Sequence, residues 1–410
     1  MRDGGRIAAA LTVLEDMEAR HKPARLALKS WAGDARYAGA KDRAFVSGLV
    51  LDVLRRRRSL AFRMGEETDR ARVLGALGLV WEWPVDRIAA AAAEEHGPGA
   101  LNAEEHDALS KPAPPEAAAY AVRGDYPDWL DPHMARVFGD NRAAEGESLA
   151  ARAPVDLRVN TLKTDLGRTL KALEPFGPRI LDRSETAIRI PAPLASERAA
   201  PVESAPEFER GWFEIQDLGS QIAASMAGDV KGRQILDFCA GGGGKTLALA
   251  AAMDNSGQLY AYDSEARRLT DTVRRSQRAG VRNLQVRSPI HPDPLAGLEA
   301  KMDVVFVDAP CTGSGTWRRH PDAKWRLSPE QLTRRMAEQD AVLDGAAPYV
   351  KPGGRMVYVT CSLFAEENED RVAAFLKRSP QFAAAGKPTR LTPLTDATDG
   401  FFVALLTRSA

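Results

Sequence analysis

The sequence predicts an α/β protein with a doubly wound, mostly parallel sheet, preceded by a small α/β module and an all-α region. Three observations predict this fold class. Strand and helix candidates alternate from residue 233 onward, which is typical of right-handed βαβ units. Short alternating segments between residues 154 and 211 indicate a small mixed module. No convincing strand precedes about residue 120, where apolar residues instead recur at helical spacing.

The predicted elements suggest three domains. Strand candidates of the sheet domain occupy 235–238, 258–262, 283–286, 304–307 and 355–360, and helix candidates include 246–253, 266–278 and 329–343. Further helices are predicted in 7–17, 45–54 and 71–93, while the prolines of 97–117 predict a linker. We therefore expect a helical domain over 1–120, a small α/β module over 121–212, and the doubly wound domain over 213–410.

Composition limits the class of protein. The chain has 410 residues, 44% of them hydrophobic and 27% charged, with 56 Lys/Arg and 56 Asp/Glu, which is ordinary for a globular protein. Its three cysteines form no CxxC pair, so neither a disulfide framework nor a metal site is expected. No apolar stretch is long enough to span a membrane and no signal sequence is evident, so we expect a cytoplasmic protein.

Charge is unevenly distributed along the amino-terminal third. Residues 1–63 hold 14 Lys/Arg and 7 Asp/Glu, whereas residues 64–150 hold 7 and 17. A basic block of this kind indicates an electrostatic face for nucleic acid. The arginine run Arg55 to Arg58 allows two interpretations: a solvated helix end interacting with its dipole, or a patch that contacts phosphates.

The segment 304–315 carries the first chemical signal. The apolar run Val304 to Val307 predicts a strand buried on both faces. It ends at Asp308, and Pro310 then prevents the strand from continuing before Cys311. An acid and a thiol therefore follow the carboxyl end of a buried strand, where open α/β sheets bind their ligands.

The first strand–helix junction predicts a nucleoside cofactor. Its glycine-rich turn lets a ligand approach the backbone, and its members are Cys239, Ala240, Gly241, Gly242, Gly243, Gly244 and Lys245. A P-loop would need glycine at Cys239, and a GxGxxG motif would need glycine at Thr246. Asp263, after the second strand, suits the hydroxyl groups of a ribose. Because the turn lacks the glycine spacing of a phosphate-binding loop, the expected cofactor is a nucleoside that needs no phosphate site, which points to S-adenosylmethionine.

Cys361 follows the fifth strand candidate and gives a second thiol. If the fourth and fifth strands are neighbours, Cys311, Cys361 and Asp308 face one pocket. Methylation of cytosine at C5 needs such groups: a thiolate to add at C6, a carboxyl group at N3 and N4, and a base for the C5 proton. The alternative is a pair of inert core cysteines. Spacing alone leaves open which thiol attacks.

At this point a family resemblance is clear. The chain resembles the RsmB–Sun family of RNA cytosine-5 methyltransferases, with a Rossmann-like class I methyltransferase domain. The segments that carry the resemblance are DFCAGGGGKT (237–246), VDAPCTGSGTWRRHPDAKW (307–325), TCSL (360–363), FEIQDLGSQ (213–221), RVNTLK (158–163) and DGFFVALL (399–406). The segment 42–58 also resembles the NusB-like helical domain of the RsmB branch. We expect the small α/β module that follows, 121–212, to be RRM-like.

The resemblance implies residue roles. Cys361 is the nucleophile, Cys311 assists release, Asp308 contacts the cytosine and lies near the cofactor, and Lys245 lines the same pocket. Residues Cys239 to Lys245 with Asp263 and Asp308 hold S-adenosylmethionine. The implied partner is RNA, a 16S-type ribosomal RNA of the small subunit, bound by a protein that we expect to be a monomer.

Other interpretations stay open at this stage. DNA cytosine methyltransferases use a Pro-Cys thiol, so Cys311 is the rival nucleophile and DNA a rival substrate. A non-catalytic RNA-binding assembly factor is a further alternative, because Gly241 and Gly242 replace the family's usual Ala-Pro. The basic residues after the Pro-Cys loop either grip RNA phosphates or belong to a solvated loop; they are Arg318, Arg319, Lys324 and Arg326.

Overall fold

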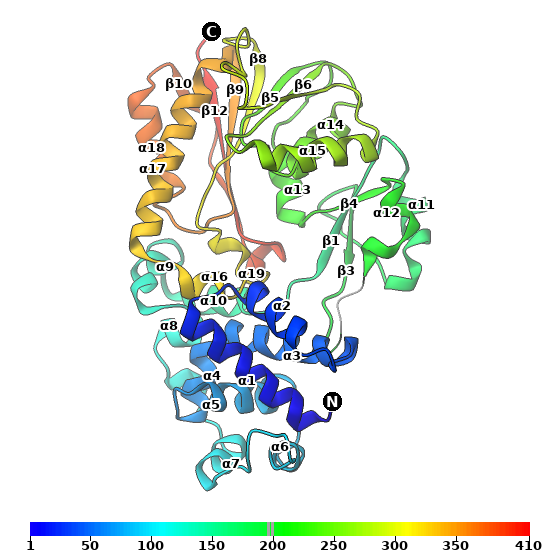
Figure 1. Ribbon diagram of the computed structural model, residues 1–410. Coiled ribbons are helices and arrows are strands. Elements are labelled where there is room, and N and C mark those ends of the chain that lie inside the picture. Colours follow the sequence, from blue (N-terminus) through cyan, green and yellow to red (C-terminus); the bar gives the residue numbers. More distant parts are fainter. Residues whose placement is uncertain (195–196, 198–200) are drawn as a thin grey trace. The chain divides into compact units, whose positions relative to one another are not determined.

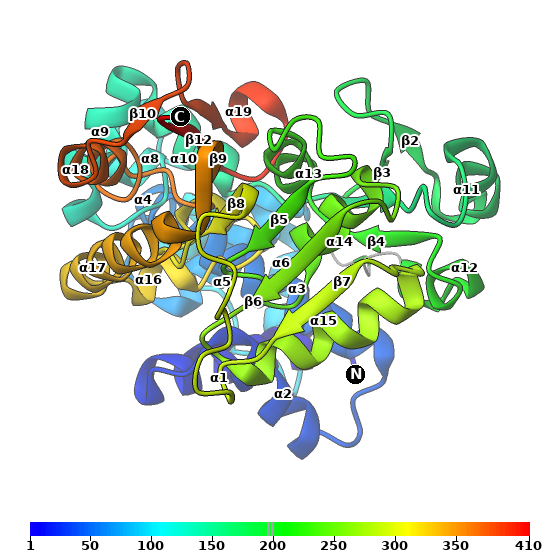
Figure 2. The same ribbon diagram turned by 90° about the horizontal axis from the view of Figure 1, so that it is seen from above.

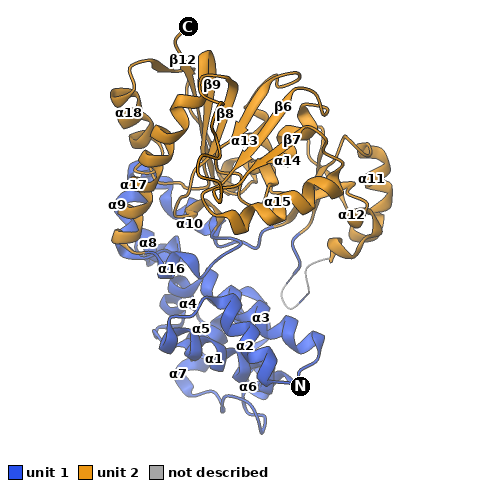
Figure 3. Cartoon of the chain, turned by 45° about the horizontal axis from the view of Figure 1, so that its top comes forward, with its two compact units in different colours: residues 1–153, 192–199, 317–327 blue, residues 154–191, 200–316, 328–410 orange. Residues whose placement is uncertain are grey.

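The computed structural model describes residues 1–194, 197 and 201–410, which form two compact units (Figure 3). Unit 1 comprises residues 1–153, 192–199 and 317–327, and unit 2 comprises residues 154–191, 200–316 and 328–410. The predicted division into three domains, with boundaries after residues 120 and 212, stays a prediction.

Unit 1 is built from helices, labelled in Figure 1. They are α1 (Asp3–Arg20), α2 (Ala24–Asp34), α3 (Ala40–Arg55), α4 (Arg57–Met64), α5 (Asp69–Gly75), α6 (Val85–Ala92), α7 (Ala103–Ser110), α8 (Tyr120–Arg123), α9 (Asp131–Phe138), α10 (Arg142–Leu149) and α16 (Ala323–Arg326). Among the described residues no strand precedes Val155, so the predicted helical amino-terminal region is confirmed.

The core of unit 1 follows from helical periodicity. In α1, Ile7, Ala10 and Leu14 are buried at spacings of three and four residues, which places them on one face. That face packs on α3, whose Val46 and Leu49 are fully buried.

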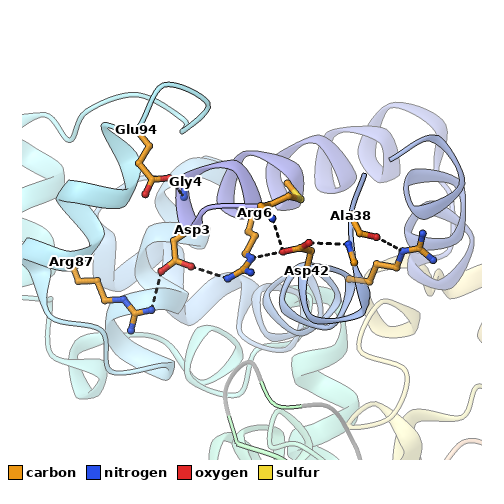
Figure 4. Close-up of polar contacts among 10 residues, drawn as sticks. Asp3, Gly4, Arg6, Ala38, Asp42, Arg87 and Glu94 are labelled. Atoms are coloured by element: carbon orange, nitrogen blue, oxygen red, sulfur yellow. Dashed lines mark hydrogen bonds and ion pairs between the residues drawn. The ribbon is translucent and has the colours of Figure 1, made fainter. Parts of the chain in front are cut away.

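A polar network ties the start of α1 to α3 (Figure 4). The buried carboxyl group of Asp42 accepts bonds from Arg6 Nε at 2.8 Å and from the Gly39 amide at 2.9 Å. Arg6 also pairs with Asp3, which in turn binds Arg87 at 2.9 Å. Burial would raise the pKa of Asp42, but the bonds from Arg6 and Gly39 outweigh it and lower the pKa to about 2.

The prediction of a linker over 97–117 is wrong for the middle of this segment, where helix α7 lies. Asn102 caps this helix and Glu105 closes a capping box with it. Leu109 packs into the core of unit 1, and Glu105 accepts a bond from Arg70 at 2.5 Å. The prolines of the segment flank the helix and do not interrupt it.

The arginine run at the end of α3 is largely occupied by carboxylates. Arg55 is buried and pairs at 3.0 Å with the buried Asp52. Arg57 pairs with Glu18 at 2.8 Å, and Arg58 pairs with Asp128 at 2.5 Å. These three arginines therefore do not form a free phosphate-contacting patch, and the burial of Arg55 does not match a solvated helix end either.

Unit 2 contains two sheets. The smaller one is antiparallel, in the order β2-β3-β1-β4. Its strands are β1 (Val155–Val159), β2 (Arg179–Ile180), β3 (Ala187–Ile190) and β4 (Phe213–Ile215), accompanied by α11 (Leu166–Ala172) and α12 (Pro206–Glu209).

The larger sheet has the order β10-β12-β9-β8-β5-β6-β7, with β11 paired to β12. Strands β5 to β9 pair in parallel, whereas β12 pairs antiparallel with β9, β10 and β11. The bounds are β5 (Gln234–Asp237), β6 (Gln258–Tyr262), β7 (Leu284–Arg287), β8 (Met302–Asp308), β9 (Val350–Thr360), β10 (Phe382–Ala384), β11 (Thr389–Leu391) and β12 (Phe401–Arg408).

Helices cover both faces of the larger sheet (Figure 2). Alternate residues of β8 enter two different cores: Val304 packs with α13 and α14, whereas Val305 packs with α17 and α18. This alternation confirms the doubly wound fold. The helices are α13 (Leu218–Ser225), α14 (Gly244–Ala252), α15 (Ala266–Ala279), α17 (Pro329–Ala346), α18 (Glu369–Arg378) and α19 (Pro393–Asp396). Within the described ranges, no helix has the length and apolar character needed to cross a membrane.

The order in which the chain adds strands to the larger sheet reverses between β5 and β8. From β5 it proceeds outward through β6 and β7, then returns to place β8 on the other side of β5. Such a reversal opens a crevice at the carboxyl ends of the two strands. The five predicted strands of the sheet are confirmed, but β10, β11 and β12 were not predicted as strands.

The charge network at the start of α1 predicts an acid-sensitive contribution to stability. The pKa of Asp42 in the folded protein, about 2, lies below its ordinary value of 3.8. The unfolded chain therefore binds the proton more readily, and the stabilisation is present above pH 4 and lost as the pH falls toward 2. Asp42→Asn should lower the free energy of unfolding by about 2 kcal/mol at neutral pH.

Urea unfolding followed by circular dichroism, measured between pH 2 and pH 7, checks this expectation. The exposed Asp34 gives the matched control, Asp34→Asn, for which no comparable pH-dependent difference is expected. A difference between wild type and Asp42→Asn that stays constant down to pH 2 would contradict it.

Candidate active site

The glycine-rich turn between β5 and α14 is held open by its backbone. Gly241 and Gly243 adopt φ angles of +53° and +84°, which only glycine adopts at little cost. A Cβ atom at Gly243 would come within 2.9 Å of Thr272 Oγ1, whereas Cβ positions at Gly241 and Gly244 face open space. The turn therefore leaves room for a ligand against its backbone.

Two acidic side chains flank this turn. Asp263, just past β6, is buried; its carboxyl group accepts bonds from the Gly241 amide at 2.9 Å and the Glu265 amide at 2.8 Å. Asp237, the last residue of β5, is also buried, and burial raises its pKa to about 7. Thr246 donates to one of its oxygens at 2.6 Å, whereas Oδ1 has no hydrogen-bond partner among the described residues.

These features fit a nucleoside cofactor. A buried acceptor without a partner beside an open glycine turn is suited to donors of a bound ligand. Sequence reasoning predicted Asp263 but missed Asp237, although its position at the end of β5, directly before the turn, was a signal that could have found it.

Lys245, at the start of α14 after β5, forms an ion pair with Asp308, the last residue of β8. Lys245 Nζ lies 2.7 Å from Asp308 Oδ2 and 5.2 Å from the ring centroid of Phe401. Burial would lower the pKa of Lys245, but attraction to Asp308 and Cys361 outweighs it and raises the pKa. Lys245 therefore stays charged at neutral pH and holds the Asp308 carboxylate in one orientation.

The two predicted thiols are in contact. The Sγ atoms of Cys311 and Cys361 lie 3.4 Å apart, and neither residue is fully buried. The hydrogen bond with Cys361, followed by burial, raises the pKa of Cys311 well above its ordinary value. The third cysteine, Cys239, lies in the glycine turn, where burial raises the pKa of its thiol.

A buried acid that sequence reasoning missed joins the two cysteine loops. Glu367 is fully buried and accepts bonds from the Thr312 amide at 2.8 Å and the Thr312 hydroxyl at 2.5 Å. Ser362, next to Cys361, donates to the same carboxyl group, and Gln339 Nε2 donates at 3.0 Å. Burial raises the pKa of Glu367. One carboxyl group thus binds the neighbour of each cysteine.

Four basic residues after the Pro-Cys loop were predicted as possible phosphate contacts, and for two of them this is wrong. Arg318 and Lys324 are buried in unit 1. Lys324 donates to the Arg55 carbonyl at 2.8 Å, and burial lowers its pKa to about 7. Arg326 pairs with Asp322 at 2.9 Å. The local sequence shows the charges but not the distant residues that bury them.

The residues that the sequence singled out therefore gather at one edge of the larger sheet. The glycine turn, Asp263, Lys245 and Asp308 lie at the ends of β5, β6 and β8, and the thiols follow β8 and β9. No cluster of three metal-binding side chains occurs in the part of the chain that the structure describes.

Comparisons with known proteins agree with this geometry. Residues 226–407 match the family model described as 16S rRNA methyltransferase RsmB/F. Ribosomal RNA small subunit methyltransferase B of Cronobacter sakazakii is 34% identical over 300 residues, which cover 71% of this chain and 68% of that protein. The probable ribosomal RNA small subunit methyltransferase B of Synechocystis is 30% identical over 418 residues, covering 90% and 92%.

Among solved structures, a methyltransferase homologue from Pyrococcus horikoshii superposes with a TM-score of 0.60 at 26% identity. It covers 70% of this chain, and 97% of its own chain is covered. The fold and the glycine turn define a class I methyltransferase, which uses S-adenosylmethionine as its methyl donor. The chain belongs to the RsmB/F methyltransferase family, as the motifs predicted. The NusB-like character of residues 1–120 stays a prediction.

The bonds to Glu367 predict that its carboxyl group fixes the spacing of the two thiols. Glu367→Ala removes the acceptor that four donor groups share, so the free energy of unfolding should fall by about 3 kcal/mol. A trivalent arsenical, which bridges neighbouring thiols, should bind the folded variant more weakly than wild type. Urea unfolding and arsenical titration measure the two effects.

Glu369→Gln is the matched control, because Glu369 lies two residues away in a half-exposed pair with Arg390. Neither measurement should change appreciably in this variant. Arsenical binding by folded Glu367→Ala at wild-type affinity would show that the thiol spacing does not depend on Glu367.

Proposed function

We propose that this chain is an RNA (cytosine-5)-methyltransferase that acts on small-subunit ribosomal RNA. The observation that carries the proposal is the contact of two thiols, 3.4 Å apart, at the strand edge that also carries the Lys245–Asp308 pair and the glycine turn. Its family and the names of its relatives support ribosomal RNA as the substrate.

In the proposed reaction, Cys361 is the nucleophile. Its thiolate adds to C6 of the cytosine, which makes C5 electron-rich and able to take a methyl group. Bound S-adenosylmethionine supplies that methyl group. The C5 proton is then removed, and the bond between sulfur and C6 breaks, so that Cys361 leaves as a thiolate and the aromatic ring is restored.

Cys311 assists the second half of the reaction. Contact with Cys361 is the main cause of its raised pKa, so in the free enzyme Cys311 holds its proton beside the attacking thiol. Once Cys361 is bonded to C6, its sulfur is a neutral thioether, and this contribution to the pKa of Cys311 disappears. Cys311 then gives its own proton to solvent water, and the resulting thiolate accepts the C5 proton.

Asp308 binds the cytosine ring, and Lys245 orients Asp308. The Asp308 carboxyl group bonds the N3 and N4 edge and stabilises the charge that develops when the thiolate adds. Lys245 orients that carboxyl group through its 2.7 Å contact. The target base must leave its stack to reach these groups.

The proposed cofactor site consists of the glycine turn and the acids around it. Its residues are Cys239, Ala240, Gly241, Gly242, Gly243, Gly244, Lys245, Asp263 and Asp308. The open Cβ positions and the unpartnered Asp237 oxygen support this assignment. Asp263 would bind the ribose hydroxyl groups, because an acid after the second strand suits these groups. Its bond from the Gly241 amide places it beside the turn.

The amino-terminal residues 1–120 are proposed as a NusB-like RNA-binding domain, followed by an RRM-like module and the methyltransferase domain from residue 213. The basic side chains that remain exposed support this proposal more directly than the arginine run at 55–58. They lie from α2 to the start of α3, in the same segment as Tyr37, which is 74% exposed, and include Arg25, Lys29, Arg36, Lys41 and Arg43. A segment that exposes several cations and an aromatic ring suits RNA.

The nucleophile assignment predicts the effect of Cys361→Ala. Without a thiol to attack C6, transfer of labelled methyl to small-subunit ribosomal RNA should fall by roughly 10³-fold or more. Calorimetric binding of S-adenosylmethionine should persist, because the glycine turn is intact. Retained transfer would move the nucleophile to Cys311.

The release role predicts the effect of Cys311→Ala. Removal of the C5 proton should slow by roughly 10²-fold or more, so the enzyme should stay bonded to the methylated RNA. A denaturing gel would detect the covalent protein–RNA adduct. The double variant Cys311→Ala, Cys361→Ala should form none, and absence of the adduct from the single variant would contradict the release role.

A further inference from the structure

Arg275 contacts the glycine turn from outside. It lies on α15, and its Nη1 atom donates to the carbonyl oxygen of Gly242 at 2.6 Å. One turn earlier on the same helix, Thr272 Oγ1 donates to the carbonyl oxygen of Gly241 at 2.8 Å. Two adjacent peptide groups of the turn are thus held by two side chains of one helix.

The Arg275 side chain is itself fixed by a buried acid. Glu214, on β4 of the smaller sheet, is 2% exposed and accepts bonds from Arg275 Nε at 3.2 Å and Nη2 at 2.9 Å. Its other oxygen accepts a bond from Arg278 Nη2 at 2.5 Å. The guanidinium group of Arg275 therefore bridges Glu214 and the glycine turn, using different edges for each partner.

The turn needs such support because it contains four consecutive glycines. Glycine has the widest range of backbone conformations, so a glycine turn loses the most entropy when a ligand orders it. Side chains that order the turn beforehand reduce that cost and so strengthen binding.

We propose that Arg275 is a positioning residue for the methyl donor: oriented by Glu214, it fixes the turn at Gly241 and Gly242 in its binding shape. This rests on the proposed assignment of the turn as the cofactor site. It also links the smaller sheet, through β4 and α15, to the affinity for the cofactor.

The test compares Arg275→Gln with Arg274→Gln in the full chain. Arg274 precedes Arg275 on α15 but is exposed and pairs with Asp271 on the same helix, at 3.1 Å. Arg275→Gln should weaken S-adenosylmethionine binding by roughly tenfold in calorimetry without RNA. It should also raise the KM for S-adenosylmethionine, with kcat and the KM for RNA nearly unchanged. Arg274→Gln should bind like wild type.

Hydrogen exchange gives a readout that does not depend on the cofactor. Without ligand, the amides of Gly241 to Gly244 should exchange faster in Arg275→Gln than in wild type or Arg274→Gln. Thr272→Val removes the neighbouring bond at nearly constant volume and should act in the same direction, which covers the case in which Arg275→Gln folds poorly.

A second substitution separates ordering of the turn from simple loss of charge. A Cβ atom at Gly242 would meet its nearest neighbour at 3.7 Å, an ordinary contact, and its φ angle is not positive. Adding Gly242→Ala to Arg275→Gln should therefore recover roughly threefold in affinity, because alanine narrows the unliganded ensemble.

Three results would overturn the inference: wild-type affinity in Arg275→Gln, unchanged exchange at the turn, or no recovery from Gly242→Ala. Failure of the wild-type protein to bind S-adenosylmethionine would instead overturn the proposed function, so the two outcomes are distinguishable.

Discussion

The parallel pairing of β8 with β9 is the constraint on which the active site depends. Its register places Asp308 beside Val359, so both strands end at the same edge, and neighbouring strands lie about 4.8 Å apart. Cys311 and Cys361 leave that edge within a few residues of the strand ends. Their contact at 3.4 Å is therefore a direct consequence of strand order, and β5, on the other side of β8, brings the glycine turn to the same edge.

Strand order alone does not fix the conformation of the loops that follow the strands. Buried carboxyl groups hold these loops in position through hydrogen bonds and ion pairs. Glu367 is satisfied by neutral donors, namely hydroxyl and amide groups from three different segments, and its raised pKa reports the cost of burying a charge without a cation. Glu214 instead pairs with two arginines. Each acid connects parts of the chain that are far apart in sequence.

This difference explains what could be predicted from sequence. Asp308, Cys311 and Cys361 were identifiable because each directly follows a strand whose apolar pattern is local. Glu367 was not, because two of the three residues that bind its carboxyl group, Thr312 and Gln339, lie 55 and 28 residues away. The same limit misled the interpretation of basic residues: the partners of Arg55 and Lys324 lie up to 269 residues away, so a local run resembled a free patch. Strand β12 was missed because it pairs antiparallel and breaks the alternation.

The two halves of the site are ordered in opposite ways, and this has a chemical consequence. The thiol loops are tied from within by one buried carboxyl group, so their spacing is set before any base enters. The glycine turn is held from outside by Thr272 and Arg275, so its inner surface stays open to a ligand. A reaction that must align a thiolate, a cytosine ring and a methyl donor gains most when each partner meets a preformed surface. The buried polar groups therefore hold the loops and the turn in position. The contacts with the ligands are left to Asp308, Lys245 and the backbone of the turn.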